Sequence, residues 1–359
     1  MRFAKRPTFV MTQVHSKTNR ADRIALCAGL GAGMGVVLII YAGSQHLKHF
    51  DRALSPYAIG TVLAAFAVAY RYAVWAQRPP TLMYLKRGWQ MFWRRGKNAP
   101  LLGKRLLDDF VLQKFIAGRS AYRWMMHACL SWGGMLAFAL TFPLVFGWIH
   151  FETLATDAEV YRVFVFGFPV EEFPIHSIRG IVHFNLLNLA AILILAGVAM
   201  SIRLRTRDKG EIAIQSFAGD ILPLLILFIV SISGLMLTVS SHLMAGYGYQ
   251  FIGIAHAASV IGLLLYLPFG KLFHIVQRPL SLGVSFYKDA EQMGSPALCR
   301  RCGNDYASQL HVDDLKIVLD QLGFNFRFAT PEGQLHYQDV CPVCRRRLFA
   351  LNQGRAVGR

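Results

Sequence analysis

Six long apolar segments constrain the fold more than any other feature of this sequence. A membrane about 30 Å thick is crossed by roughly 20 consecutive apolar residues in a helix. Only 16 % of the 359 residues are charged, whereas soluble domains carry about 25 %. The sequence therefore predicts an all-α membrane protein, built as a bundle of six transmembrane helices. The six segments are residues 24–43, 56–76, 122–148, 179–202, 217–240 and 252–275.

The net charge of +18 is distributed along the chain in a way that indicates topology. Lys and Arg gather in the N-terminal tail, in the 77–121 connection and in the 203–209 turn, whereas the 149–178 connection is acidic. Cytoplasmic loops of membrane proteins carry an excess of Lys and Arg. We therefore expect both termini on the cytoplasmic side. Membrane lipid, and no nucleic acid, is the expected environment of this basic chain.

Changes of composition along the chain predict three parts. Residues 1–23 form a basic N-terminal tail, residues 24–285 the membrane domain, and residues 286–359 a small cytoplasmic domain. Apolar residues recur at three- and four-residue spacing near 104–117, which predicts an amphipathic helix on the inner membrane surface. A membrane-surface helix and a docking site for a partner both fit this segment.

The membrane histidines are the strongest functional signal, because histidine is costly in hydrocarbon. His256 and His274 are eighteen residues apart. In one helix this spacing is five turns, so both side chains would share a face, roughly 27 Å apart. Two haems stacked across a membrane need such ligands, each completed by a second imidazole at matching depth. We expect His127 to pair with His274 on the inner side and His183 with His256 on the outer side, with His242 as the alternative to His183.

Small and basic residues near these histidines suit a haem environment. Glycines would let the macrocycles approach the helices, and basic side chains at the membrane edges could contact the haem propionates. For any one of the basic residues, structural anchoring is the alternative role. The glycines are Gly133, Gly134 and Gly262, and the basic residues are Arg123, Arg179 and Lys271.

Two Cys-x-x-Cys pairs in the C-terminal part predict a metal site. Each pair supplies two thiolates from a tight turn, and together they complete a tetrahedral four-cysteine site. Zinc and a single iron both fit, and the spacing disfavours an iron–sulfur cluster. We expect one structural zinc, with iron as the alternative, in a zinc-ribbon-like α+β domain. Residues 313–322 predict a helix, and residues 324–340 a hairpin. The four ligands are Cys299, Cys302, Cys341 and Cys344.

Two stretches of the membrane domain resemble known cytochrome b families. Residues 123–136, which include Arg123-Trp124-Met125-Met126-His127, together with the 106–114 segment upstream, resemble the haem-bearing segment of heterodisulfide reductase-type membrane cytochrome b subunits. Residues 256–275, with their histidine spacing and the Pro268-Phe269-Gly270-Lys271 step, are similar to the last helix of respiratory nitrate reductase gamma subunits. The resemblance covers roughly residues 100–280.

The resemblance implies a cytochrome b subunit with two b haems in a respiratory redox complex of a bacterial or archaeal cytoplasmic membrane. Such a subunit exchanges electrons with quinone and docks an iron–sulfur protein on its cytoplasmic face. It is an electron-transfer subunit rather than a stand-alone enzyme. The nitrate reductase type has two ligands ten residues apart on the facing helix, but the residue ten beyond His127 is Ala137. The alternative is a haem-free membrane scaffold or transporter with a zinc-ribbon interaction domain.

Overall fold

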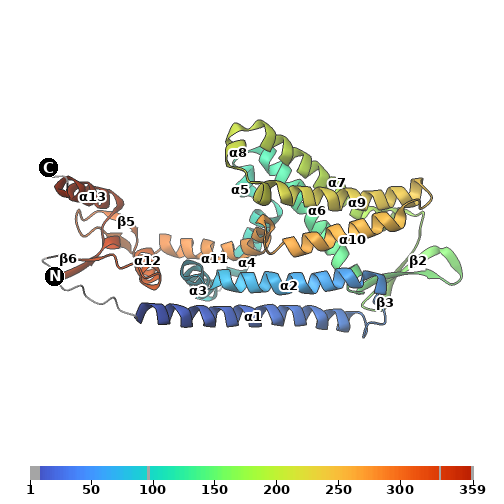
Figure 1. Cartoon of the computed structure of the whole chain (residues 1–359), viewed down its shortest axis with the longest axis horizontal. Helices are drawn as coiled ribbons and strands as arrows, with labels where there is room; N and C mark the ends of the chain where they lie inside the picture. Colours follow the sequence, from blue (N-terminus) through green and yellow to red (C-terminus); the bar gives the residue numbers. More distant parts are fainter. Residues whose placement is uncertain (1–8, 95–97, 331–332, 357–359) are drawn as a thin grey trace. The chain divides into compact units, whose positions relative to one another are not determined.

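The computed structural model describes residues 9–94, 98–330 and 333–356, and these residues are mostly helical (Figure 1). The helices are α1 (Phe9–Gly43), α2 (Ser55–Ala76), α3 (Pro79–Arg94), α4 (Asn98–Leu106), α5 (Lys114–Ala117), α6 (Ala121–Val145), α7 (Ile178–Arg207), α8 (Lys209–Ile214), α9 (Leu222–Leu243), α10 (Tyr249–Tyr266), α11 (His274–Gln292), α12 (Gln309–Gln321) and α13 (Pro342–Ala356). The strands are β1 (Ile149–Leu154), β2 (Asp157–Val165), β3 (Phe168–Pro174), β4 (Pro296–Leu298), β5 (Asp305–Ser308), β6 (Arg327–Thr330) and β7 (Gly333–His336).

The chain forms two compact units. Unit 1 comprises residues 1–73 and 107–276, and unit 2 comprises residues 74–106 and 277–359.

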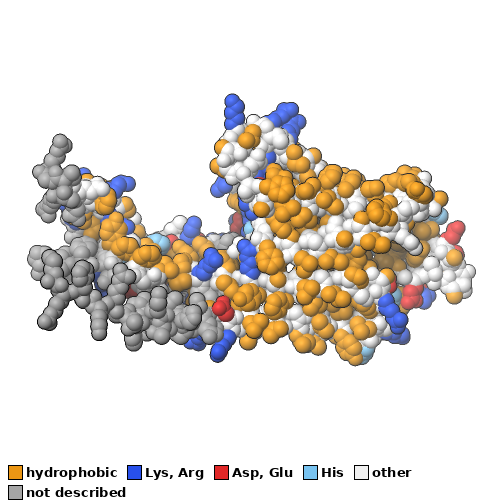
Figure 2. Space-filling model, in the orientation of Figure 1, with side chains coloured by type: hydrophobic (Ala, Val, Ile, Leu, Met, Phe, Trp, Pro, Cys, Tyr) orange, Lys and Arg blue, Asp and Glu red, His pale blue; other side chains and the backbone are white. Residues whose placement is uncertain are grey.

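Within the described residues, six helical segments are long and apolar enough to cross a membrane. Most of their side chains are not buried inside the protein, and apolar side chains cover much of the visible surface of the helices (Figure 2). Such a surface requires an apolar solvent. The chain is therefore a multi-pass membrane protein, in agreement with the sequence prediction. The six segments are Arg20–Gly43, Arg52–Ala76, Ala121–Val145, Ile178–Arg207, Phe217–Leu243 and Tyr249–Tyr266.

The sixth apolar segment is not one continuous helix. Helix α10 ends at Tyr266, and α11 begins only at His274. Pro268 lies just after the end of α10, where its ring and its missing N–H disfavour further helix. The prediction of a single 252–275 helix is therefore wrong. The inference that His256 and His274 share one helix face fails with it.

Close helix packing in unit 1 explains one of the glycines. Helix α7 packs against both α6 and α9, and α9 packs against α10. A Cβ at Gly133 of α6 would lie 2.8 Å from Cγ1 of Ile194 and 2.9 Å from the carbonyl oxygen of Ala190, both on α7. A Cβ at the neighbouring Gly134 would meet nothing within 4 Å. Gly133 therefore allows α6 and α7 to approach each other, rather than making room for a macrocycle.

Replacing Gly133 with alanine is expected to destabilise the bundle by about 1–3 kcal/mol, because the added methyl group overpacks the α6–α7 contact. Thermal denaturation of the detergent-solubilised chain measures the effect. Gly134→Ala is the matched control, since it makes the same chemical change on the same helix turn in open space. Equal denaturation temperatures for the two variants would contradict this account of Gly133.

The connection between α6 and α7 folds into a three-stranded antiparallel sheet in the order β1-β2-β3. Ile149 pairs with Val165 in one ladder, and Tyr161 pairs with Phe173 in the other. The sequence analysis predicted only an acidic connection here, so the all-α description of the membrane domain is incomplete. Acidic residues interrupt the alternation of apolar and polar residues in these strands, so the hydropathy pattern did not predict the sheet.

Unit 2 contains the predicted C-terminal elements together with a segment that is distant in sequence. Helix α12 covers the predicted 313–322 helix and is followed by Gly323, whose φ of +82° suits a residue without a Cβ. Strands β6 and β7 form a hairpin within the predicted 324–340 region. Residues 74–106 also belong to this unit, and its C-terminal part begins at 277 rather than at the predicted 286. The helix predicted near 104–117 is divided among the end of α4, a π-helical turn at Leu107–Val111 and the short α5.

A buried carboxylate joins three helices of unit 2. Asp314 of α12 has a side chain that is only 3 % exposed. It accepts hydrogen bonds from the Arg87 guanidinium of α3 at 2.7 and 3.1 Å and from the Tyr287 hydroxyl of α11 at 3.1 Å. Burial and the nearby Asp314 charge raise the pKa of Tyr287, so its hydroxyl keeps its proton and acts as a donor. The basic 74–106 segment is thereby fastened to the C-terminal helices.

Candidate functional site

The four predicted cysteine ligands lie together in unit 2. Their sulfur atoms are all within 4.8 Å of one another, and three of the four residues are buried. The Sγ atoms of Cys302 and Cys341 are 3.8 Å apart. Sulfurs bound tetrahedrally to zinc at about 2.3 Å are separated by about 3.8 Å. The prediction that the two pairs converge is confirmed, and this four-cysteine cluster could hold a metal ion such as zinc.

Backbone amides stabilise sulfur charge in the four-cysteine cluster. The amide of Cys341 donates to Sγ of Cys299 at 3.2 Å, and the amide of Cys344 donates to Sγ of Cys341 at 3.4 Å. Burial raises the pKa of Cys299, but amide donors from Cys341, Cys302 and Arg301 outweigh burial and lower that pKa to about 6. Burial and the adjacent thiols raise the pKa of Cys344 to about 12. A bound cation would stabilise all four thiolates at once.

His127 of α6 is oriented by a buried glutamine. Its Nδ1 lies 2.8 Å from Oε1 of Gln113. The amide nitrogen of Gln113 donates to Ser131, which identifies Oε1 as the acceptor. His127 therefore donates from Nδ1, and its lone pair is on Nε2.

Two tryptophans fasten the segment that carries Gln113 to α6. The indole N–H of Trp124 donates to the carbonyl of Leu112 at 2.9 Å, and that of Trp132 donates to the carbonyl of Val111 at 3.1 Å. The backbone of Gln113 is left-handed, with φ of +51°. The segment upstream of α6 thus serves to position His127.

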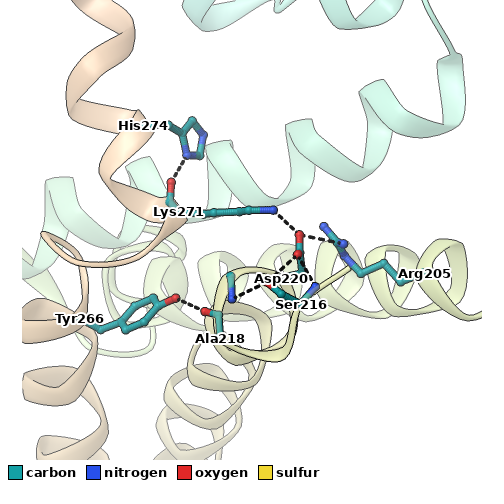
Figure 3. A network of polar contacts seen from close by, with 8 residues as sticks. Arg205, Ser216, Ala218, Asp220, Tyr266, Lys271 and His274 are labelled. Carbon is teal, nitrogen blue, oxygen red and sulfur yellow. Dashed lines mark hydrogen bonds and ion pairs between the residues drawn. The ribbon is translucent and has the colours of Figure 1, made fainter. Parts of the chain in front are cut away.

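His274 lies beside a network of charged groups (Figure 3). Its Nδ1 donates to the carbonyl of Lys271 at 2.5 Å, which again leaves the lone pair on Nε2. The Lys271 ammonium pairs with Asp220, which is 7 % exposed and also contacts Arg205 of α7 at 3.1 Å. The second carboxylate oxygen of Asp220 accepts from the amide of Ser216 at 2.9 Å. The turn that bears His274 is therefore held to α7 and to the start of α9.

His256 of α10 faces α9. Its Nδ1 is 3.0 Å from Oγ of Ser233, and that hydroxyl donates to the carbonyl of Ile229 at 2.7 Å. Ser233 must then accept from His256, so Nε2 carries the lone pair here as well. A Cβ at Gly234 would lie 3.2 Å from Cε1 of His256, so a glycine makes room for the ring.

His183 belongs to the sheet end of unit 1. Its Nδ1 donates to the carbonyl of Arg179 at 2.8 Å, and its Nε2 is 3.9 Å from a carboxylate oxygen of Glu171. Its ring stacks on Phe173 of β3 with centroids 4.9 Å apart. The alternative, His242, makes a similar hydrogen bond to the carbonyl of Thr238 at 3.1 Å.

Two interhelical hydrogen bonds fix the relative depths of His183 and His256. Thr238 of α9 donates to Asn188 of α7, which places these residues at one level. His183 is five residues from Asn188 toward the sheet end, whereas Ser233, the partner of His256, is five residues from Thr238 in the opposite direction. Ten residues at 1.5 Å each correspond to about 15 Å along the bundle.

The predicted depth match of His183 with His256 is therefore not found. His242 is nine residues from Ser233 along α9, or about 14 Å, so it does not share the level of His256 either. The hydropathy pattern gives the position of each histidine relative to the end of its own helix. It does not give the offset between neighbouring helices along the bundle, and that offset separates His183 from His256.

The basic residues considered for haem propionates contact carboxylates of the chain itself. Arg123 lies 3.6 Å from Asp208, and Arg179 lies 3.1 Å from Glu171. Lys271 pairs with Asp220. These contacts favour the alternative role of structural anchoring.

A second group of possible metal ligands was missed by the sequence analysis. One ligand atom each from His49, His150 and Glu152 lies within 4.8 Å of the others. The alternation of His150 and Glu152 in a strand was a usable signal, since residues i and i+2 share a face. The strand itself was not predicted, and nothing local in the sequence links it to His49.

Comparison with known proteins gives no match to any family model, curated protein or solved structure. The function is therefore inferred from the residues of this chain.

Proposed function

We propose that this chain is a membrane cytochrome b subunit that carries electrons between a quinone and an iron–sulfur partner on the cytoplasmic side, through two b haems. One observation carries the proposal. His127, His256 and His274 each donate Nδ1–H to an acceptor of the protein. Metal-ligating histidines almost always donate their other ring N–H in this way, which orients the ring and raises the basicity of the ligating nitrogen. The quinone and the partner are proposed from the sequence resemblance of residues 100–280 to cytochrome b families, which is itself part of the proposal.

The same histidines define what the chain contributes to haem binding. His127 and His274 would hold one haem, and His256 would contribute to holding the other. A Cβ at Gly134 or at Gly262 would meet nothing within 4 Å, so the packing assigns neither glycine to a macrocycle. Haem supplies the one-electron redox chemistry when bound, and the protein orients the imidazoles and excludes water. His183 is the weakest of the four proposed ligands, because it lies about 15 Å from the level of His256.

For the four-cysteine cluster we favour zinc in a structural role. Three buried cysteines and amide donors to sulfur are typical of closed, four-coordinate structural zinc sites. An iron centre that relays electrons is the alternative, and metal analysis of the purified chain distinguishes the two. In the proposed topology both termini and this cluster are cytoplasmic, and the acidic sheet end faces the opposite side of the membrane.

A reduced-minus-oxidised optical spectrum of the purified full-length chain tests the proposal, with haem quantified per polypeptide. We expect close to two b haems. His256→Ala and His274→Ala are each expected to lose about one, because an imidazole ligand to iron is removed. His176→Ala is the matched control, since His176 is an exposed histidine beside the start of α7.

The outcomes separate the proposed function from its alternative. Full haem content in His183→Ala would agree with the depth offset and exclude His183 as a ligand. An absence of haem in chain produced with ample haem would overturn the cytochrome proposal. It would favour a haem-free scaffold or transporter.

A further inference from the structure

Three side chains gather at the sheet end of unit 1, where His183 also lies. His49 lies in the turn between α1 and α2, whereas His150 and Glu152 lie on β1. One ligand atom of each lies within 4.8 Å of the others. Residues i and i+2 of a strand point to the same face, so β1 presents an imidazole and a carboxylate side by side.

The spacing within β1 suits one shared ion. Nε2 of His150 is 3.5 Å from Oε1 of Glu152. Ligands bound tetrahedrally to zinc at about 2.0–2.1 Å are separated by about 3.4 Å. The Glu152 side chain is 56 % exposed, which gives an ion access from solvent.

His49 is oriented by a glutamine whose own amide is fixed. The side-chain nitrogen of Gln45 donates to the carbonyl of Phe166 at 3.1 Å, so its Oε1 is the acceptor. Nε2 of His49 lies 3.1 Å from that Oε1 and therefore donates to it. The lone pair of His49 is then on Nδ1, in the arrangement typical of a histidine ligand whose other ring nitrogen is held by an acceptor of the protein.

His150 supplies an independent sign that a ligand belongs here. Neither of its ring nitrogens has a hydrogen-bond partner among the described residues, and both are buried. Its side chain is 17 % exposed, and its ring is stacked between the rings of His49 and Phe164 at centroid distances of 4.3 and 4.8 Å, so one imidazole would have to rotate for both lone pairs to meet one ion. Buried polar atoms are normally satisfied, and an exception calls for an ion or a water molecule.

We propose that His49, His150 and Glu152 bind a divalent transition-metal ion, zinc above all. Two imidazoles and one carboxylate are a known zinc ligand set that leaves a fourth position for water. The ion would link the α1–α2 turn to the sheet between α6 and α7. This site is independent of the four-cysteine cluster and of the haem proposal.

Zinc binding by the full-length chain in detergent tests this site. Bound zinc is counted per polypeptide after equilibrium dialysis against a buffered free zinc concentration, for the wild type and for His150→Asn and Glu152→Gln. We expect each variant to bind one equivalent less than the wild type, while the four-cysteine cluster retains its own ion. Glu152→Gln is a safe second variant, because it changes an exposed side chain without altering its size.

His46→Asn is the matched control. His46 lies in the same turn and outside the ligand group, and its φ of +60° is a conformation that asparagine tolerates. Zinc content equal to the wild type in this control, together with the loss in both ligand variants, supports the site. The same zinc content in His150→Asn, Glu152→Gln and the wild type would overturn it.

Discussion

Replacing Cys341 with serine is expected to release the metal from the four-cysteine cluster and to unfold the cysteine-bearing end of unit 2. Cys341 is central to the cluster, because its sulfur lies 3.8 Å from that of Cys302 and accepts the amide of Cys344. The buried core around it is small, consisting of the other buried cysteines and Val340, with Tyr306, Leu335 and Leu348 packed against them. Structural zinc contributes about 10–16 kcal/mol in zinc-finger peptides, far more than this core can supply.

Metal content and limited proteolysis of the full-length chain measure the effect. The wild type is expected to retain about one metal ion per four-cysteine cluster and to resist cleavage between residues 295 and 356. Cys341→Ser should lose both properties, and a strong chelator should reproduce the loss in the wild type. Cys27→Ser is the matched control, since Cys27 lies in α1 of unit 1 and outside the cluster. A Cys341→Ser chain with unchanged metal content and cleavage would refute a metal-stabilised fold.

Acidification should have the same consequence as the chelator. Protons compete with the metal for the thiolates, so metal affinity falls as the pH falls. Burial and the adjacent thiols raise the pKa of Cys344 to about 12. Its proton is therefore the hardest for the metal ion to displace.

The sequence predicted the features of this protein that local patterns encode. The six apolar segments appear as candidate membrane helices because hydropathy is a property of consecutive residues. The convergence of the two Cys-x-x-Cys pairs could be predicted because such pairs in a small domain are typical ligands of one metal site. The α12 helix and its glycine stop follow from the same local rules.

Tertiary contacts account for what the sequence did not predict. Arg87 and Asp314 are 227 residues apart, and only the fold shows that the basic 74–106 segment packs with the C-terminal helices. The contact of His49 with His150 depends on a sheet that hydropathy did not reveal. The depth offset between His183 and His256 depends on how far each helix slides along its neighbour, which interhelical hydrogen bonds decide.

The difference between local patterns and tertiary contacts also explains why the helix break before His274 was not predicted. The eighteen-residue spacing describes a straight helix, and Pro268 and Gly270 were assigned to a family motif rather than to a helix end. In the structure these residues end α10, and the orientation of His274 depends instead on the turn that contains Lys271. An ion pair rather than helix periodicity therefore positions this proposed ligand.

Replacing Asp220 with asparagine is accordingly expected to destabilise unit 1 by about 1–2 kcal/mol, because Arg205, whose side chain is 23 % exposed, loses its partner, whereas Lys271, at 62 %, stays solvated. One carboxylate oxygen contacts both Arg205 and Lys271, and the other accepts from Ser216. The neutral amide keeps the shape of the side chain but removes the charge that both cations face. Thermal denaturation in detergent measures the loss.

Asp208→Asn is the matched control for this prediction. Asp208 lies at the same end of α7 and pairs with Arg123 at 3.6 Å, but its side chain is 40 % exposed. Exposed ion pairs contribute about 0–1 kcal/mol, so this variant should denature close to the wild-type temperature. If both variants behave alike, the Asp220 network does not hold the His274 turn in place. If only Asp220→Asn is destabilised, and it also loses haem that Asp208→Asn retains, the network stabilises the bundle and positions a histidine that would hold haem.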